Sequence, residues 1–479
     1  MLQIGAIAAV LVVIPNPAFD LDRFLIPKEL VLHLTAVISA LFAFRSIRRV
    51  TMTRVDWLLI AYLGISALSA ALATNRWLAL RALAVSASGI LLFWTARGLR
   101  AAGLDRQLVN AIAIAVVTSS FVSLLQAYGV RLDFFASSRA PGGTLGNRNF
   151  VAHVAAFGLP VVILAALRAQ RASAYFAASA GVAIVTASLV LSRSRAGFLA
   201  FAVMFVIMCI GSVKMWSRFA GVLLFAAGGV AAALVLPNAL HWHSRNPYVE
   251  SVRGVANYEE GSGRGRLLQY TRSMNLLLHH PIFGAGPGNW TVEYPAYVRD
   301  SDPSMNSSEP GTTFNPWPSS DWVSFVSERG LIAGVLIALA LIGIAITARD
   351  ATLLATIAAL VVAGLFDAVL LLAVPTLIAW TVIGALWSPQ PAPRTMPAWI
   401  PLLVAAISAI GAFRSGSQIV AMEMYTTGGR AALERASQID PGNYRIHMRL
   451  ASRCEHARAA HALFPNAEAA KSAARRCGK

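Results

Sequence analysis

Two arginines stand in a very short connection between two long apolar runs. The stretch LSRSRAGFLA occupies residues 191–200, and only one or two residues separate Arg193 and Arg195 from apolar sequence on either side. A guanidinium stays protonated, and its planar donors can bind two phosphate oxygens at once, so the pair suits a lipid diphosphate at the membrane boundary. Two side chains that snorkel from a helix end to water are the alternative interpretation.

A further arginine stretch, GSGRGRLLQYTRSMNLLLHHPIFGAGPGNW, occupies residues 261–290. Apolar residues at near-helical spacing predict a helix over residues 266–280, ended by Pro281 and a glycine-rich turn. Arg266 then lies in the first turn, where its guanidinium and free backbone N–H groups can bind an anion together. A solvated arginine at a helix start is the alternative. We predict weaker substrate contacts from side chains in or beside these stretches: Arg193, Arg264, Asn147, Tyr270 and His280.

A group transfer from a lipid diphosphate needs more than cations. The negative charge on the departing diphosphate must be stabilised, and a base must take the proton of the incoming hydroxyl. The carboxylates considered for the base are Glu293, Glu309, Asp321 and Glu328. We select Asp321, although an acid that follows PSS at the start of a predicted span is first of all typical of helix capping.

Other chemistries find little support in the sequence. The HWH stretch at 241–243 and the HH pair at 279–280 lack the further ligands of a metal site. The chain has no Walker or dinucleotide fingerprint, and GAGPGNW follows no predicted strand, so it indicates a tight turn rather than a phosphate loop. We therefore predict neither a metal nor a cofactor.

Composition determines which elements must carry these side chains. The chain of 479 residues is 57% hydrophobic and 13% charged, with a mean hydropathy of +0.62, whereas soluble domains are about 25% charged. Apolar runs of spanning length occur near residues 2–15, 28–44, 56–73, 80–96, 108–128, 149–167, 174–191, 197–212, 218–236, 322–347, 351–366, 368–387 and 397–413. The first run lacks a charged leader and a cleavage site, so it is interpreted as a span. The sequence predicts an all-α polytopic membrane protein with about 12–13 transmembrane helices.

Arginine-rich short loops set the predicted orientation. Alternate loops carry Arg45, Arg48, Arg49 and Arg54, then Arg97, Arg100 and Arg106, then Arg168 and Arg171, then Lys214 and Arg218. The positive-inside rule places these loops and the N-terminus in the cytoplasm. The LSRSRAG turn then faces outward, which topogenic arginines do not explain. We expect N-terminal spans over 1–237, a large outer loop over 238–321, C-terminal spans over 322–414 and an outer helical tail over 415–479.

The net charge of +18 suits anionic lipid, an anionic substrate, or both. Its scatter between the spans argues against nucleic-acid binding. In the tail, AALERASQIDPGNYRIHMRLASR at 431–453 resembles one tetratricopeptide-like hairpin. Cys454 and Cys477 could form a disulfide there if the tail is exported.

Several of these stretches together resemble the O-antigen ligase and polymerase family. The resemblance is carried by DRFLIPKELVL (22–32), GGTLGNRNFVAHVA (142–155), LSRSRAGFLAF (191–201) and RGRLLQYTRSMNLLLHHPIFGAGPGNW (264–290), and is extended by ERGLIAG (328–334) and GLFDAVLLLAVP (364–375). It implies a metal-independent glycosyltransferase of the bacterial inner membrane. Its donor would be an undecaprenyl-diphosphate-linked glycan on the periplasmic side. By position, Arg195 and Arg266 match the family's two arginines.

The resemblance leaves the acceptor open. Family members ligate O-antigen to lipid A–core, polymerise repeats, or transfer glycan to pilin-like proteins. Ligases of the family carry a histidine where this chain has Ser319, so Asp321 would substitute as the base or the transfer differs. A lipid-linked sugar transporter would instead require ionisable residues buried in mid-span. The predicted span centres are nearly free of charge, with Asp367 the main exception. An inactive scaffold that recruits partners through its tail is the remaining alternative.

Overall fold

The structure is a computed structural model that describes residues 1–19, 21–46, 51–136, 139–242, 247–254, 261–389 and 394–478. In this part of the chain, nine helices are long and apolar enough to cross a membrane, and four shorter apolar helices accompany them. The nine are α2 (Asp22–Ser46), α3 (Arg54–Leu72), α4 (Arg76–Ala101), α5 (Asp105–Ala127), α6 (Arg148–Leu167), α7 (Ala172–Ser192), α9 (Trp216–Val235), α13 (Asp321–Ile346) and α16 (Trp399–Thr427). The four are α1 (Leu2–Leu11), α8 (Arg195–Gly211), α14 (Ala351–Phe366) and α15 (Ala373–Leu386). They correspond one to one to the predicted apolar runs, and the all-α polytopic class is confirmed.

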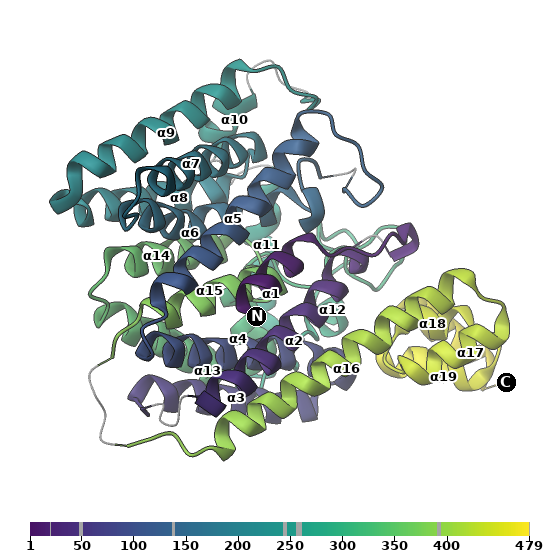
Figure 1. The fold of residues 1–479 in the computed structure, drawn as a ribbon. Coiled ribbons are helices and arrows are strands. Elements are labelled where there is room, and N and C mark those ends of the chain that lie inside the picture. The colour runs from purple at the N-terminus through teal and green to yellow at the C-terminus, as the bar shows by residue number, and fades with distance from the viewer. Residues whose placement is uncertain are drawn as a thin grey trace.

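Helix α6 lies at the centre of the bundle (Figure 1). It packs against α5, α7, α8 and α14, and nearly all of its apolar stretch is buried. Its start is fixed locally, because the Asn147 side chain accepts a hydrogen bond from the backbone N–H of Asn149 at 3.0 Å. Side chains in the first turns of α6 are therefore held rigidly.

One end of the bundle collects most of the irregular segments, and we call it the loop face. It comprises the turns at residues 139–149, 193–195 and 367–371 together with the short helices between α9 and α13. Contacts join these segments: Arg193 bonds to Ser251, Arg148 stacks on Trp242, and Asn149 bonds to Asp367. The short helices are α10 (Pro247–Arg253), α11 (Gly261–His279), α12 (Trp290–Glu293) and η5 (Tyr294–Tyr297).

The glycine-rich turn after α11 is anchored in a break of helix α13. Gly330 interrupts α13 with φ = 82°, and this break receives the turn, since the N–H of Leu331 donates to the Pro281 carbonyl at 2.9 Å. Asn289, at the end of the turn, accepts the backbone N–H of Asn75 at 2.7 Å. The geometry agrees with the tight turn predicted for GAGPGNW.

Buried charge is more abundant than the sequence analysis expects. Lys28 and Glu29 on α2 and Arg414 on α16 are all buried, and Arg81 on α4 makes an ion pair of 2.7 Å with Glu29. Lys28, Glu29 and Arg81 lie at the starts of their predicted spans, and Arg414 directly follows the last one, so these charges do not lie at the predicted span centres. Arg81 lies one turn and a half from the start of α4, and the Arg414 Nε donates to the carbonyl of nearby Trp77 at 3.0 Å. These groups satisfy one another or the backbone where the helices meet the loop face, which indicates a structural role.

The tail forms four short helices at the end of α16 (Figure 1). They are α17 (Arg430–Ile439), α18 (Tyr444–Arg449), α19 (Cys454–Leu463) and α20 (Glu468–Arg476), and Cys454 is bonded to Cys477 as a disulfide. The tail rests on the loop face, because the N–H of Glu468 donates to the Pro310 carbonyl and the Asn466 amide donates to the Val292 carbonyl, both at 3.0 Å. Its relation to tetratricopeptide repeats stays a prediction.

Gly330→Ala should lower the melting temperature of the purified protein in detergent. A non-glycine residue at this φ costs on the order of 1–3 kcal/mol, and its methyl group would overlap the Ile282 carbonyl oxygen. Gly64→Ala in α3 is the matched control, since nothing lies within 4 Å of the added methyl group. Equal melting temperatures for Gly330→Ala and the wild type would contradict the role of the Gly330 break in anchoring the turn.

Candidate functional site

The 193–195 turn presents arginines to the loop face. Arg193 ends α7 in the left-handed conformation, with φ = 53°, and its Nε donates to Ser251 at 2.9 Å. The Arg193 and Arg148 guanidiniums lie 4.6 and 5.0 Å from the centre of the Trp242 ring, which is a cation–π arrangement. The pKa of Arg193 is lowered, mainly because the side chain is partly buried. Neighbouring Arg195 lowers this pKa further, whereas Glu250 acts against the shift.

Arg195 starts α8 directly after this turn. The side chain of Ser194 caps the helix by accepting the N–H of Gly197 at 3.3 Å, which fixes the first turn of α8. The half-buried Arg195 guanidinium lies against the backbone of Gly254, where an added methyl group would overlap it. Among the described residues it forms no hydrogen bond or ion pair.

Arg266 is a second arginine near α6. It lies in the first turns of α11 and is close enough to His153 on α6 to interact electrostatically. The α8 start packs against the same part of α6, since a methyl group at Gly197 would touch the Ala152 side chain. The first turn of α8 and Arg266 of α11 thus lie near adjacent residues of α6, Ala152 and His153. Arg266, too, has no acidic partner within the described ranges.

The positive charges at this site outnumber their counterions. Arg148 is within electrostatic range of both Arg193 and Arg139, and Glu250, paired with Arg193 at 3.5 Å, is an exposed side chain. Like charges held together in a fixed, partly buried arrangement repel one another unless an anion joins them. The arrangement is therefore suited to a multiply charged anion.

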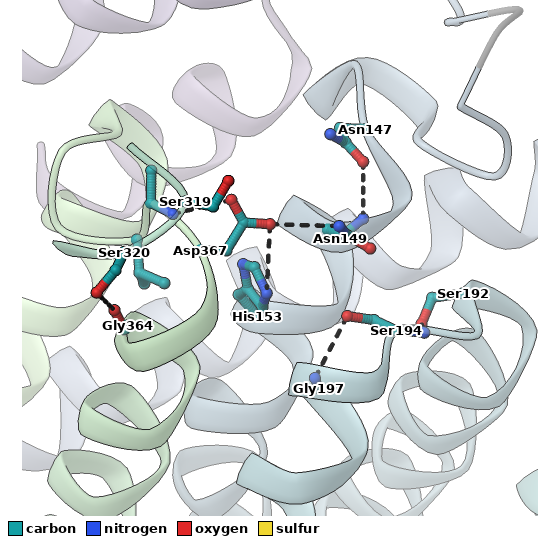
Figure 2. Close-up of polar contacts among 12 residues, drawn as sticks. Asn147, Asn149, His153, Ser192, Ser194, Gly197, Ser319, Ser320, Gly364 and Asp367 are labelled. Carbon is teal, nitrogen blue, oxygen red and sulfur yellow. Dashed lines mark hydrogen bonds and ion pairs between the residues drawn. The ribbon is translucent and has the colours of Figure 1, made fainter. Parts of the chain in front are cut away.

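Asp367 forms a polar cluster with two side chains of α6, as Figure 2 shows. Its Oδ2 accepts a hydrogen bond of 3.3 Å from the Asn149 amide and lies 4.0 Å from Nε2 of His153. The Asp367 side chain is 13% exposed, whereas His153 is fully buried. The site residues predicted from sequence include none of these three. Asn149 and His153 nevertheless lie in GGTLGNRNFVAHVA, and Asp367 lies in GLFDAVLLLAVP.

In the structure, Asp321, the base predicted from the sequence, stabilises the turn at residues 367–371. Its side chain is fully buried, and its two oxygens accept the backbone N–H groups of Val369 and Leu370 at 2.9 and 2.8 Å. A base must reach the hydroxyl that it deprotonates, whereas both oxygens of Asp321 are buried and bonded to backbone N–H groups. It holds the turn that carries Asp367 instead.

Ser319, at the position of the ligase histidine, is held by its backbone. Its N–H donates to the Gln269 side chain at 2.6 Å, and its carbonyl accepts the Tyr270 hydroxyl at 2.6 Å. The same hydroxyl lies 2.7 Å from the Leu365 carbonyl. Tyr270 thus ties α11 to the segment before α13 and to the last turn of α14, next to the Asp367 cluster.

The remaining predicted substrate contacts lie further away or act in the fold. His280 lies at the far end of α11 and lines a separate pocket with Thr74 and Glu293. Arg264 is exposed to solvent, and Asn147 caps α6. The described residues contain no group of three or more His, Cys, Asp or Glu side chains that could hold a metal ion.

Asp321→Asn should reduce stability by about 1–3 kcal/mol, because its amide NH₂ would face one of the two backbone N–H groups and leave it without an acceptor. Thermal unfolding of the purified protein measures this change. An unchanged melting temperature together with lost transfer activity would contradict the supporting role and return Asp321 to the role of base.

Comparison with known proteins supports a family for part of the chain. The family model for O-antigen ligase matches residues 180–338, a range that includes Arg193, Arg195, Arg266 and Asp321. No curated protein matches the chain. Residues 180–338 of this multi-pass membrane protein are therefore similar to the O-antigen ligase family, which supports glycan transfer of the ligase or polymerase type in general.

Proposed function

We propose that this protein transfers a glycan from undecaprenyl diphosphate to an acceptor at the loop face, on the periplasmic side of the bacterial inner membrane. The observation that carries the proposal is the set of arginines around the start of α6 that lack acidic partners within the described residues. The diphosphate of a lipid-linked glycan is a multiply charged anion held at the membrane boundary. It would complete this site.

Arg195 and Arg266 bind the diphosphate from two sides in this proposal, with Arg193 and Arg148 adding positive potential. The acceptor oxygen forms a bond to the first sugar carbon, and the bond from that carbon to the diphosphate oxygen breaks. The bonding electrons leave with the diphosphate, whose growing charge the guanidiniums stabilise. Fixed donors of this kind contribute on the order of 10²–10³ in rate each.

The disulfide supports the periplasmic side. Disulfides persist in oxidising compartments such as the bacterial periplasm. The tail that contains Cys454–Cys477 rests on the loop face through Pro310 and Val292. If the tail is periplasmic, the loop face with its arginines is periplasmic as well.

The acceptor is the least constrained part of the proposal. Lipid A–core is the acceptor of a ligase, a growing glycan that of a polymerase, and a hydroxyl side chain that of a protein O-oligosaccharyltransferase. Ser319, in place of the ligase histidine, separates this chain from the ligases at the position of the base. We propose ligase-like transfer with a different base, and the surface glycans of a deletion strain would identify the acceptor.

Arg195→Ala and Arg266→Ala should each lower glycan transfer by at least about 10²-fold, because each removes a fixed cation from the departing diphosphate. Membrane insertion should stay normal, since neither side chain has a hydrogen-bond partner among the described residues. The assay is transfer by purified protein in nanodiscs, with lipid-linked glycan extracted from a deletion strain as donor and envelopes of that strain as acceptor.

Arg171→Ala is the matched control for these arginines. Arg171 is exposed and precedes α7 at the end opposite the 193–195 turn, so its loss should leave transfer unchanged. Wild-type transfer rates in both Arg195→Ala and Arg266→Ala would refute the proposed site.

The orientation can be tested by labelling intact cells with a membrane-impermeant thiol reagent in a Cys209→Ser background. Ser308 is exposed in the long segment between α9 and α13. In the Ser308→Cys variant the new thiol should be labelled, because this segment faces the periplasm in our proposal. Ala102 is exposed between α4 and α5, and the new thiol of the Ala102→Cys variant should not react with the reagent. The reverse pattern would place the loop face in the cytoplasm.

A further inference from the structure

We propose that Asp367 is the base that activates the acceptor hydroxyl and that His153 is the residue that positions it. This inference rests on the proposed function and identifies the group that takes over from the histidine of the ligases. It depends on the juxtaposition of Asp367 with Asn149, His153 and the Ser319 segment (Figure 2).

Asp367 has the accessibility that a base needs. Its side chain is 13% exposed at the loop face. The turn that carries it is held by Asp321, which accepts hydrogen bonds from the N–H groups of Val369 and Leu370. The Oδ1 atom of Asp367 accepts the N–H of Ala368 at 2.9 Å. Its Oδ2 atom faces Asn149 and His153.

The other carboxylates considered are occupied elsewhere. Glu328 is buried, and its oxygens accept the Ser324 hydroxyl at 2.8 Å and the Trp290 N–H at 3.4 Å. Glu293 accepts the Thr74 hydroxyl at the separate pocket near His280. Glu309 lies beside Tyr444 of the tail. Asp367 is the carboxylate that faces the same part of α6 as the arginines.

His153 is an unusual residue to find without a partner. It is fully buried in the most enclosed span, and neither of its ring nitrogens has a hydrogen-bond partner within the part of the chain that the structure describes. A buried polar group without a partner costs about 1–3 kcal/mol, which a purely structural position would not maintain. Its Nε2 lies 4.0 Å from Asp367, and such contacts often shorten when substrate binds.

The same arrangement places the base beside the leaving group. Arg266 is within electrostatic range of His153, and Asp321 is within range of Asp367. The carboxylate that accepts a proton and the guanidinium that stabilises the diphosphate thus both lie near His153. A sugar bound between them would have its diphosphate at the arginines and its first carbon near Asp367.

The step balances without a further reactant. As the acceptor oxygen bonds to the sugar carbon, its proton moves to Oδ2 of Asp367, and the electron pair of the broken carbon–oxygen bond leaves with the diphosphate. The Asn149 amide and the Nε2–H tautomer of His153 keep Oδ2 directed at the acceptor. The proton on Asp367 then passes to water at the exposed loop face.

The test uses the transfer assay in nanodiscs, with lipid-linked glycan extracted from a deletion strain as donor. Asp367→Asn should lower kcat by about 10²–10⁴-fold, the usual contribution of a general base, with little change in the donor KM. Asp367→Glu should recover part of the loss. His153→Ala should lower kcat by a smaller factor, and His153→Gln, which keeps an N–H donor, should recover part of that loss.

Asp350→Asn is the matched control, because Asp350 caps the opposite end of α14 and pairs with Arg168 at 3.2 Å. It should keep the wild-type kcat. Binding of undecaprenyl diphosphate to each variant in nanodiscs shows that the arginine site is still folded. Wild-type kcat in Asp367→Asn would overturn this inference alone. Failure of the wild-type protein to use the polyprenyl-diphosphate donor would instead overturn the proposed function, and this inference with it.

Discussion

Mutual repulsion among fixed guanidiniums is the constraint on which the rest of this structure depends. Arg148, Arg193 and Arg195 start or end helices at the loop face, and Arg266 enters from α11. Long flexible cations in water could move apart, but these are held by helix caps, an aromatic ring and close backbone packing. The fold thus keeps a concentrated positive potential at the loop face, and in the proposed function an anionic headgroup relieves it.

Much of the architecture can be understood as the support of that potential. The centrally buried α6 fixes the side chains at its start, and the break at Gly330 anchors the turn after α11. Tyr270 ties α11 to the segments around α13 and α14. The tail covers part of the loop face and carries the disulfide. Elements that are distant in sequence thereby keep Arg195, Arg266 and Asp367 around one helix.

The sequence predicts the bundle well because spanning helices have a strong local signature. Each apolar run of about 20 residues corresponds to a helix, and Arg195 and Arg266 could be selected because cations next to apolar runs are conspicuous. Helix α16 continues to Thr427, well beyond the last predicted span, which ends at residue 413 directly before Arg414. The Arg414 guanidinium is buried against Trp77 and Gln418, a neutralisation that only the tertiary structure reveals.

The base could not be identified in the same way, because its environment is built from distant segments. Asp321 and Asp367 both follow local patterns typical of a helix end. Which of them is buried depends on a turn 48 residues away from Asp321, and the partner of Asp367 on α6 is 218 residues away in sequence. His153 has no local feature that distinguishes it from a buried structural histidine. Its lack of a partner becomes visible only when its neighbours are known.

The most direct test of the central claim is an experimental structure of the full chain in nanodiscs with undecaprenyl diphosphate bound. The account predicts the diphosphate at the loop face, with its oxygens within hydrogen-bond distance of both the Arg195 and the Arg266 guanidiniums. A diphosphate bound elsewhere, or a complex in which those two side chains turn away from each other, would contradict it.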